Sequence, residues 1–177
     1  MKHALVVYES MFGNTAKIAQ AVADGLRSGM SVEVVEVSAA PVALGEVDLL
    51  VVGGPTHAFG MSRQTTRADA GRQGADQHAA AGIGLREWVE RVAAGGAASP
   101  LLAAFDTKVK RPRLPGSAAR AARNRLRRAG FRPAAPATNF YVEGTPGPLT
   151  GGEEERARAW GERLALIVSS AGAQRLT

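Results

Sequence analysis

The sequence predicts a single α/β domain, residues 1–177, in which a doubly wound parallel sheet is covered by helices on both faces. Short β-branched apolar runs alternate with segments that carry apolar residues at helical spacing, and this alternation requires crossovers between parallel strands. The length of 177 residues suits one domain, and no internal repeat or linker divides it. Hydrophobic residues form 45% of the chain and charged residues 21%, as is typical of a globular protein.

Three strands and one long helix are expected near the N-terminus. Nearly continuous apolar runs are typical of strands buried on both faces. The strands predicted in this way are residues 4–8, 32–37 and 47–52. Between the first two, Ile18, Val22 and Leu26 recur at four-residue steps, which predicts a helix that ends near Gly29. The segment around residues 41–46 has room for only a turn or two of helix.

Two more strands and three helices are expected after a long loop. Residues 55–81 show no periodicity, and loops of this length are usually functional or mobile. Apolar runs predict strands at residues 101–105 and 139–142. The predicted helices are residues 85–94, 116–129 and 153–168, with apolar stripes formed by Leu85, Trp88, Val89 and Val92, by Ala119, Ala122 and Leu126, and by Trp160, Leu164 and Ile167.

Composition excludes several classes of function. The chain has no cysteine, which removes disulfides, thiolate metal sites, iron–sulfur ligation and thiol nucleophiles. Its 3 histidines lack metal-ligand spacing, so we expect no metal site, and Ser10 lacks the flanking motif of a hydrolase nucleophile. No apolar run is long enough to span a membrane, and the N-terminus turns polar too early for a secretory signal. We therefore expect a cytoplasmic protein without a membrane span.

Positive charge is concentrated in one segment. The chain has a formal net charge of +6, and residues 108–132 hold ten of its basic residues and no acidic one. Within this segment, Arg120, Arg123 and Arg127 recur at helical spacing. The stripe is either a solvated helix face or an electrostatic patch for an anionic partner, such as an acidic redox protein or a phosphate-bearing ligand. No aromatic residue interleaves the charges between 108 and 130, so nucleic-acid binding is not expected.

The loops that follow the first, third and fourth strands are the candidate ligand site. Ligands of doubly wound sheets bind outside the carboxyl ends of the strands, where the strand order reverses. Residues 10–15, Ser-Met-Phe-Gly-Asn-Thr, join the first strand to a helix N-terminus, where free N–H groups and the helix dipole favour an anion. The same residues also suit a simple capping turn. The loop has neither the lysine of a Walker A motif nor the glycines of a dinucleotide fingerprint.

Residues 6–15, Val-Val-Tyr-Glu-Ser-Met-Phe-Gly-Asn-Thr, resemble the phosphate loop of the flavodoxin family, with Phe12 in place of the usual central Thr or Ser. Residues 53–60 stand where the second family loop follows the third strand, residues 105–108 stand at the third loop, and residues 147–153 resemble the closing segment of short flavodoxin-domain proteins. The resemblance implies a five-stranded sheet of order 2-1-3-4-5, non-covalently bound FMN, and transfer of one or two electrons.

The resemblance also implies which residues contact FMN. They are Ser10, Met11, Phe12, Gly13, Asn14 and Thr15 in the first loop, Pro55, Thr56, His57, Ala58, Phe59 and Gly60 in the second, and Phe105, Asp106 and Thr107 in the third. Phe59 and Phe105 take the places of the aromatic residues that usually stack on the flavin, since the chain has no Trp or Tyr there. His57 would contact the flavin edge or cap a turn, and Asp106 would accept a hydrogen bond from the pyrimidine edge or begin a turn.

Three functions remain open at this point. The first is an FMN-binding redox protein that exchanges electrons with a partner, which is an acidic protein if the basic segment recognises it. The second is an FMN-dependent oxidoreductase of the quinone or protoporphyrinogen type, in which residues 55–81 help to shape a substrate pocket. The third is an interaction module with a degenerate flavin site and a basic face that binds anions.

Overall fold

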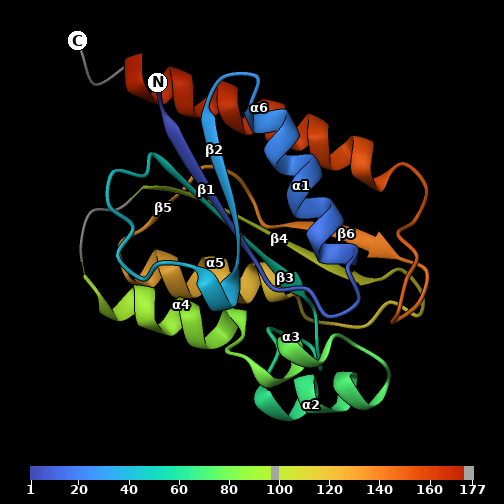
Figure 1. Cartoon of the computed structure of the whole chain (residues 1–177). Helices are drawn as coiled ribbons and strands as arrows, with labels where there is room; N and C mark the ends of the chain where they lie inside the picture. Colours follow the sequence, from blue (N-terminus) through green and yellow to red (C-terminus); the bar gives the residue numbers. More distant parts are fainter. Residues whose placement is uncertain (97–99, 174–177) are drawn as a thin grey trace.

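The computed structural model describes residues 1–96 and 100–173, which form one parallel sheet between layers of helices (Figure 1). The strands are β1 (His3–Tyr8), β2 (Ser31–Glu36), β3 (Leu49–Pro55), β4 (Leu101–Val109), β5 (Arg132–Pro133) and β6 (Thr138–Val142). The helices are α1 (Asn14–Leu26), the 3₁₀ turn η1 (Val37–Ala39), α2 (Gln64–Arg72), α3 (Gln77–Ala81), α4 (Leu85–Ala94), α5 (Ala118–Arg128) and α6 (Glu153–Ala173).

The strand order is 2-1-3-4, with the fifth place divided between two strands. β5 pairs with the start of β4, at Leu101 and Leu102, and β6 pairs with its far half, from Phe105 to Val109. The expected order is thus confirmed, and the additional strand arises because β4, at 9 residues, is longer than its apolar run. The polar end of β4, Asp106 to Lys108, is still held in the ladder by β3 and β6.

Helices cover both faces of the sheet, as the alternation of strands and helices predicts. Ala4 and Val6 of β1 face one core, which α1 and α6 complete with Leu26, Trp160 and Leu164. The intervening strand residues face a second core, formed with α4 and α5. Figure 1 shows α1 with α6 on one side of the sheet and α4 with α5 on the other, while α2 and α3 lie beyond its edge. Because β1 and β3 lead into different layers, the sheet has its switch point between their carboxyl ends.

The structure differs from three sequence-based expectations. Residues 55–81 are not a continuous loop, because they contain α2 and α3, whose surfaces carry too few apolar residues to give a periodic signal. Residues 41–46 form no helix, and a 3₁₀ turn precedes them. In α6, Ile167 is 37% exposed and Val168 is buried, because Val168 continues the four-residue step from Trp160 and Leu164.

None of the helices within the described residues is long and apolar enough to cross a membrane.

Candidate functional site

A cavity of about 310 Å³ opens at the carboxyl edge of the sheet, beside the switch point. The loop after β1, the end of β3 and the end of β4 contribute three of its sides, and α2 contributes a fourth. Its lining is Met11, Phe12, Asn14, Thr15, Pro55, Thr56, His57, Ala58, Thr66, Asp69, Ala70, Gln73, Thr107, Lys108, Val109, Val142 and Thr145. The volume is at the lower end of the range for small-molecule sites, about 300–1,000 Å³.

The loop after β1 presents unengaged backbone donors to this cavity. Gly13, with φ at +87°, turns the chain into α1, and the space above its Cα is open. Ser10 Oγ accepts hydrogen bonds from the N–H groups of Gly13 and Ala16, at 3.1 and 3.2 Å, so Ser10 braces the turn from inside. The N–H groups of Asn14 and Thr15 bond to no other described residue. They lie in the first turn of α1, where N–H groups and the helix dipole together favour an anion.

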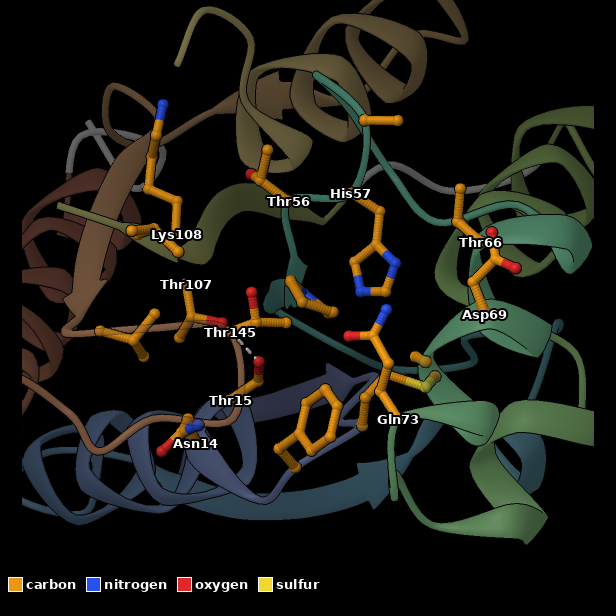
Figure 2. Close-up of a pocket in the computed structure, with 17 residues that line it drawn as sticks. Asn14, Thr15, Thr56, His57, Thr66, Asp69, Gln73, Thr107, Lys108 and Thr145 are labelled. Atoms are coloured by element: carbon orange, nitrogen blue, oxygen red, sulfur yellow. Dashed lines mark hydrogen bonds between the residues drawn. The ribbon is translucent and has the colours of Figure 1, made fainter. Parts of the chain in front are cut away.

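Buried hydroxyl groups form the floor of the cavity. Thr15 and Thr107 are 2% and 5% exposed, and their Oγ1 atoms share a hydrogen bond of 2.7 Å. Figure 2 shows the two side chains pointing toward one another from α1 and β4. Asn14 donates from Nδ2 to the carbonyl of Pro146, at 3.1 Å, so its amide fastens the 143–147 loop over the start of α1. The floor therefore offers neutral donors and acceptors in place of charged groups.

His57 enters the cavity as a neutral imidazole at pH 7. Burial lowers the pKa of His57 below its ordinary value of 6.5, and the positive charge of Arg67 lowers it further. Arg67 is itself buried, and its guanidinium pairs with Glu87 at 3.0 Å. Figure 2 shows the side chains of His57 and of Gln73, which directly follows α2, both directed into the cavity. A neutral imidazole can donate one hydrogen bond and accept another.

Asp106 lies outside the cavity, and its carboxylate is satisfied within the protein. It is 0% exposed, and its Oδ2 accepts hydrogen bonds from Thr56 Oγ1 at 3.0 Å, Ser117 Oγ at 2.6 Å and the Ala119 N–H at 3.0 Å. Its Oδ1 accepts from Asn139 Nδ2 at 2.7 Å. The carboxylate therefore accepts from the first turn of α5, whose N-cap is Ser117, and links this turn to Thr56 after β3 and to β6. This differs from the expected contact with the flavin pyrimidine edge, and we leave Asp106 out of the ligand set.

Phe105 is also absent from the cavity. Its ring is 0% exposed and packs edge-on against Phe140 and Trp160, with centroids 6.0 and 6.2 Å away. The ring lies over Gly53, where an added Cβ would come within 2.0 Å of Phe105 Cζ. The sequence-based prediction that Phe105 stacks on the cofactor is therefore corrected, because this side chain belongs to the core shared with α1 and α6.

The structure brings most of the remaining predicted site residues together. Those that line the cavity are Met11, Phe12, Asn14, Thr15, Pro55, Thr56, His57, Ala58 and Thr107. Ser10 and Gly13 line a second hollow of about 990 Å³, on the other side of the same loop, which Met11 and Phe12 also border. Phe59 and Gly60 lie outside both, and the Phe59 side chain is 59% exposed.

Sequence reasoning missed the contribution of α2. Thr66, Asp69 and Ala70 of this helix line the cavity together with Gln73, which follows its last residue, and Figure 2 shows Thr66, Asp69 and Gln73 coming from the same side of it. Thr66 Oγ1 accepts a hydrogen bond from the Arg63 N–H at 2.9 Å, which helps to start the helix. The sequence signal for this start is a Thr three residues after Arg63, a spacing that is too common to identify a helix by itself.

The fold and the position of the cavity define a class of proteins, namely doubly wound α/β proteins that bind a ligand at the switch point of the sheet. The sequence profile of the flavodoxin family matches residues 6–160, and the chain therefore belongs to the flavodoxin family. No curated protein sequence matches the chain.

Solved structures share the fold at low sequence identity. A flavodoxin from the domain Archaea is 20% identical, with a TM-score of 0.68 over 94% of this chain and 99% of its own. Oxidised flavodoxin 1 from Bacillus cereus is 14% identical, with a TM-score of 0.68 over 93% of this chain and 98% of its own. Rubredoxin oxygen:oxidoreductase from Desulfovibrio gigas is 17% identical, with a TM-score of 0.67, but the match covers 96% of this chain and only 37% of that protein.

FMN is the cofactor of the flavodoxin family, whose members transfer electrons to partner proteins. The residues present in the cavity fit its phosphate. Open N–H groups at the start of α1 stand beside buried hydroxyls, and the one carboxylate of the lining, Asp69, pairs with Arg72 on the exposed face of α2. Among the described residues of the lining, Phe12 and His57 supply the aromatic rings, and neither is a Trp or Tyr.

Proposed function

We propose that this protein binds FMN in the cavity at the switch point and exchanges electrons between the flavin and a redox partner. The proposal rests mainly on one observation, which is the set of unengaged N–H groups of Asn14 and Thr15 beside the hydroxyl floor. These groups would hold the phosphate with neutral donors and the dipole of α1. The flavin itself supplies the redox chemistry, while the protein supplies binding, orientation and electrostatics.

The remaining residues would position the ring system. Pro55, Thr56, His57 and Ala58 border one side of the cavity, and Thr107 borders its floor. The neutral His57 imidazole would hydrogen-bond the flavin edge without adding a charge. Phe12, half-buried where the family usually has Thr or Ser, would contact the cofactor through its ring instead of a hydroxyl.

A comparison of two flavins tests this proposal. FMN added to the purified protein should bind with quenched fluorescence and a shifted visible spectrum, and riboflavin should bind at least about tenfold more weakly, because it lacks the phosphate that makes charge-assisted hydrogen bonds. Equal affinities for the two flavins would contradict the phosphate site. Failure to bind either flavin would favour the degenerate interaction module.

The polar face of α2 favours one further candidate function. Thr66, Asp69 and Gln73 line the cavity opposite the hydroxyl floor, which a simple electron carrier does not require. They suit an FMN-dependent oxidoreductase that binds a small quinone-like substrate against the flavin. Steady-state reduction of menadione by the FMN-loaded protein distinguishes the two functions. An oxidoreductase shows saturation and a higher KM in Gln73→Ala, whereas a carrier shows second-order rates that this substitution leaves unchanged.

A further inference from the structure

A strained turn next to the cavity holds an aromatic side chain in solvent. His57 and Gly60 exchange two backbone hydrogen bonds, of 2.8 and 2.9 Å, which close a tight turn. Its central residues, Ala58 and Phe59, have φ angles of +41° and +73°. This combination belongs to a type I′ turn, which normally takes Gly, Asn or Asp because L side chains are strained there. The Phe59 side chain nevertheless occupies the turn and is 59% exposed.

A second exposed apolar side chain lies on the adjoining loop. Residues 110–116 follow β4, and every one of them is exposed, with Leu114 at 53%. Lys108 Nζ donates to the carbonyls of Leu114 and Gly116, at 3.2 and 2.8 Å, and holds this loop against the end of β4. Gly116, with φ at +91°, touches the turn directly, since an added Cβ would lie 2.0 Å from the Phe59 carbonyl oxygen.

The loop that carries Leu114 is also basic. Lys110, Arg111 and Arg113 are exposed, and none of them forms a salt bridge within the described residues. Two carboxylates lie near Lys110: Glu143, which lines a small hollow of about 240 Å³ with Lys110 and Arg111, and Glu153, which pairs with Arg156 and whose pKa the Lys110 charge helps to lower. Glu153 is already paired with Arg156, and Glu143 offsets only part of the three positive charges, so this corner of the molecule stays positive. Two exposed apolar groups therefore lie next to a basic stretch of chain.

The arginines of α5 do not, as a group, add to the positive charge around residues 110–116. Arg125 pairs with Glu90 at 2.8 Å, and Arg123 Nε donates to the Ala135 carbonyl. The helix starts at the cavity edge, at Ala118, and runs 11 residues away from it, roughly 16 Å at 1.5 Å per residue. Arg127 and Arg128 therefore stand at the opposite edge of the sheet, so the structure divides the stripe that the sequence suggests.

We propose that Phe59 and Leu114, with Lys110, Arg111 and Arg113 around them, form the docking surface for an acidic redox protein. This inference rests on the proposed function, because the surface matters for electron transfer only if FMN occupies the cavity beside it. An apolar centre with a charged rim is the usual anatomy of a protein interface, and its charge selects a negatively charged partner. The surface borders the cavity at two points, since His57, Ala58 and Lys108 line the cavity from the same turn and strand.

Binding to an acidic probe protein tests the surface. The FMN-loaded protein is titrated with a strongly acidic [2Fe–2S] ferredoxin by surface plasmon resonance, at low and at physiological ionic strength. We expect association that weakens about tenfold or more over this range, as the Debye length shrinks from ~30 Å at 0.01 M to ~8 Å. The triple variant Lys110→Gln, Arg111→Gln, Arg113→Gln should lower the association rate and flatten the salt dependence. The double variant Phe59→Ser, Leu114→Ser should raise the dissociation rate about tenfold.

A matched control and a flavin titration complete the test. Arg127→Gln with Arg128→Gln removes charge at the far end of α5 and should change neither rate. FMN affinity, measured by fluorescence on the charge variants and on Leu114→Ser alone, should stay within about twofold of the parent, so loss of docking is distinguishable from failure of the proposed function. An unchanged salt dependence in the triple variant overturns the inference. Tighter binding of basic cytochrome c than of the ferredoxin also overturns it. Displacement of the ferredoxin by a single-stranded oligonucleotide overturns it as well. Loss of FMN in the Phe59 variant would instead assign this ring to the flavin.

Discussion

The loop after β1 and the carboxylates at the same edge of the sheet differ in whether their polar groups are already bonded. The N–H groups of Asn14 and Thr15, at the start of α1, have no hydrogen-bond partner among the residues that the structure describes. Asp106, at the end of β4, accepts four hydrogen bonds from its surroundings. Glu9, directly after β1, accepts from Ser62 Oγ and from the Leu85 N–H at 2.7 Å. A position at the edge where ligands bind therefore does not by itself make a ligand contact.

The buried carboxylates stabilise the arrangement of the elements around the site instead of contacting a ligand. Buried acceptors with every partner inside the protein fix the elements around them, because a displaced partner would lose its hydrogen bond without water to replace it. Asp106 joins α5 to Thr56 after β3 and to β6, and the Glu9 carboxylate joins the end of β1 to Ser62 and to the start of α4. The unsatisfied donors of the β1 loop are the ones left for a ligand. The carboxylates that are fully hydrogen-bonded within the protein thus fix the elements around a site whose backbone donors are available to a ligand.

Removing Asp106 should give the largest effect on stability. In Asp106→Ala, the buried Ser117 hydroxyl and the buried Ala119 N–H lose their acceptor at the start of α5, and the part-buried Thr56 and Asn139 lose one as well. Each buried group left unpaired costs about 1–3 kcal/mol, so we expect the free energy of unfolding to fall by about 3 kcal/mol or more. Urea unfolding followed by circular dichroism measures the loss.

A cavity-lining carboxylate provides the matched control. Asp69 lies on the exposed side of α2 and pairs only with Arg72, so Asp69→Ala should change the free energy of unfolding by less than about 1 kcal/mol. Equal losses in the Asp106 and Asp69 variants would mean that carboxylates bonded within the protein do not stabilise the fold more than solvent-exposed ones.

A smaller effect, on ligand affinity, is expected in the open site. Thr15→Val removes a hydroxyl from the floor beside the free N–H groups and should weaken FMN binding by about 1–2 kcal/mol, the scale of a hydrogen bond to a charged group. Thr15→Ser keeps the hydroxyl and should recover most of the affinity. Fluorescence titration with FMN and with riboflavin gives both values. A loss of the same size for riboflavin would move Thr15 away from the phosphate.

The sequence predicted the sheet and the position of the loop after β1 because both have local signals. Apolar runs locate the five principal strands, and the Ser10–Thr15 loop follows the first of them. α2 could not be predicted, since its buried residues are Arg67 and Ala70 and its anchor is a bond from Arg67 to Glu87, 20 residues away. The burial of Phe105 depends on Gly53 in the neighbouring strand, which gives its ring room. Both outcomes depend on contacts between segments that are distant in the sequence.

The smallest expected effect is a change in the pH dependence of stability, which tests the buried hydrogen bonds of the Glu9 carboxylate. Burial raises the pKa of Glu9 above its ordinary value of 4.5, although the hydrogen bonds from Ser62 and Leu85 and the charge of Arg67 oppose this. The folded state then holds the Glu9 proton more tightly than the unfolded state. The parent protein should therefore lose free energy of unfolding as the pH rises from 4.5 through the raised pKa, by about 1.4 kcal/mol for each unit of upward shift.

Glu9→Gln removes this titration and keeps one oxygen as an acceptor, so its stability should lack that decline. Urea unfolding at pH 4.5, 5.5, 6.5 and 7.5, roughly the range in which a carboxyl with a raised pKa titrates, measures the difference between the two proteins.

Glu87→Gln is the control, because the pKa of Glu87 is shifted in the opposite direction. Burial raises the pKa of Glu87, but the hydrogen bonds and charge of Arg67 more than offset this, so Glu87 contributes stability above pH 4.5 that is lost as the pH falls through the lowered pKa. Parallel pH curves for the parent and Glu9→Gln would mean that Glu9 titrates as it does in the unfolded chain, and the carboxylate after β1 would then be as open to solvent as the donors beside it.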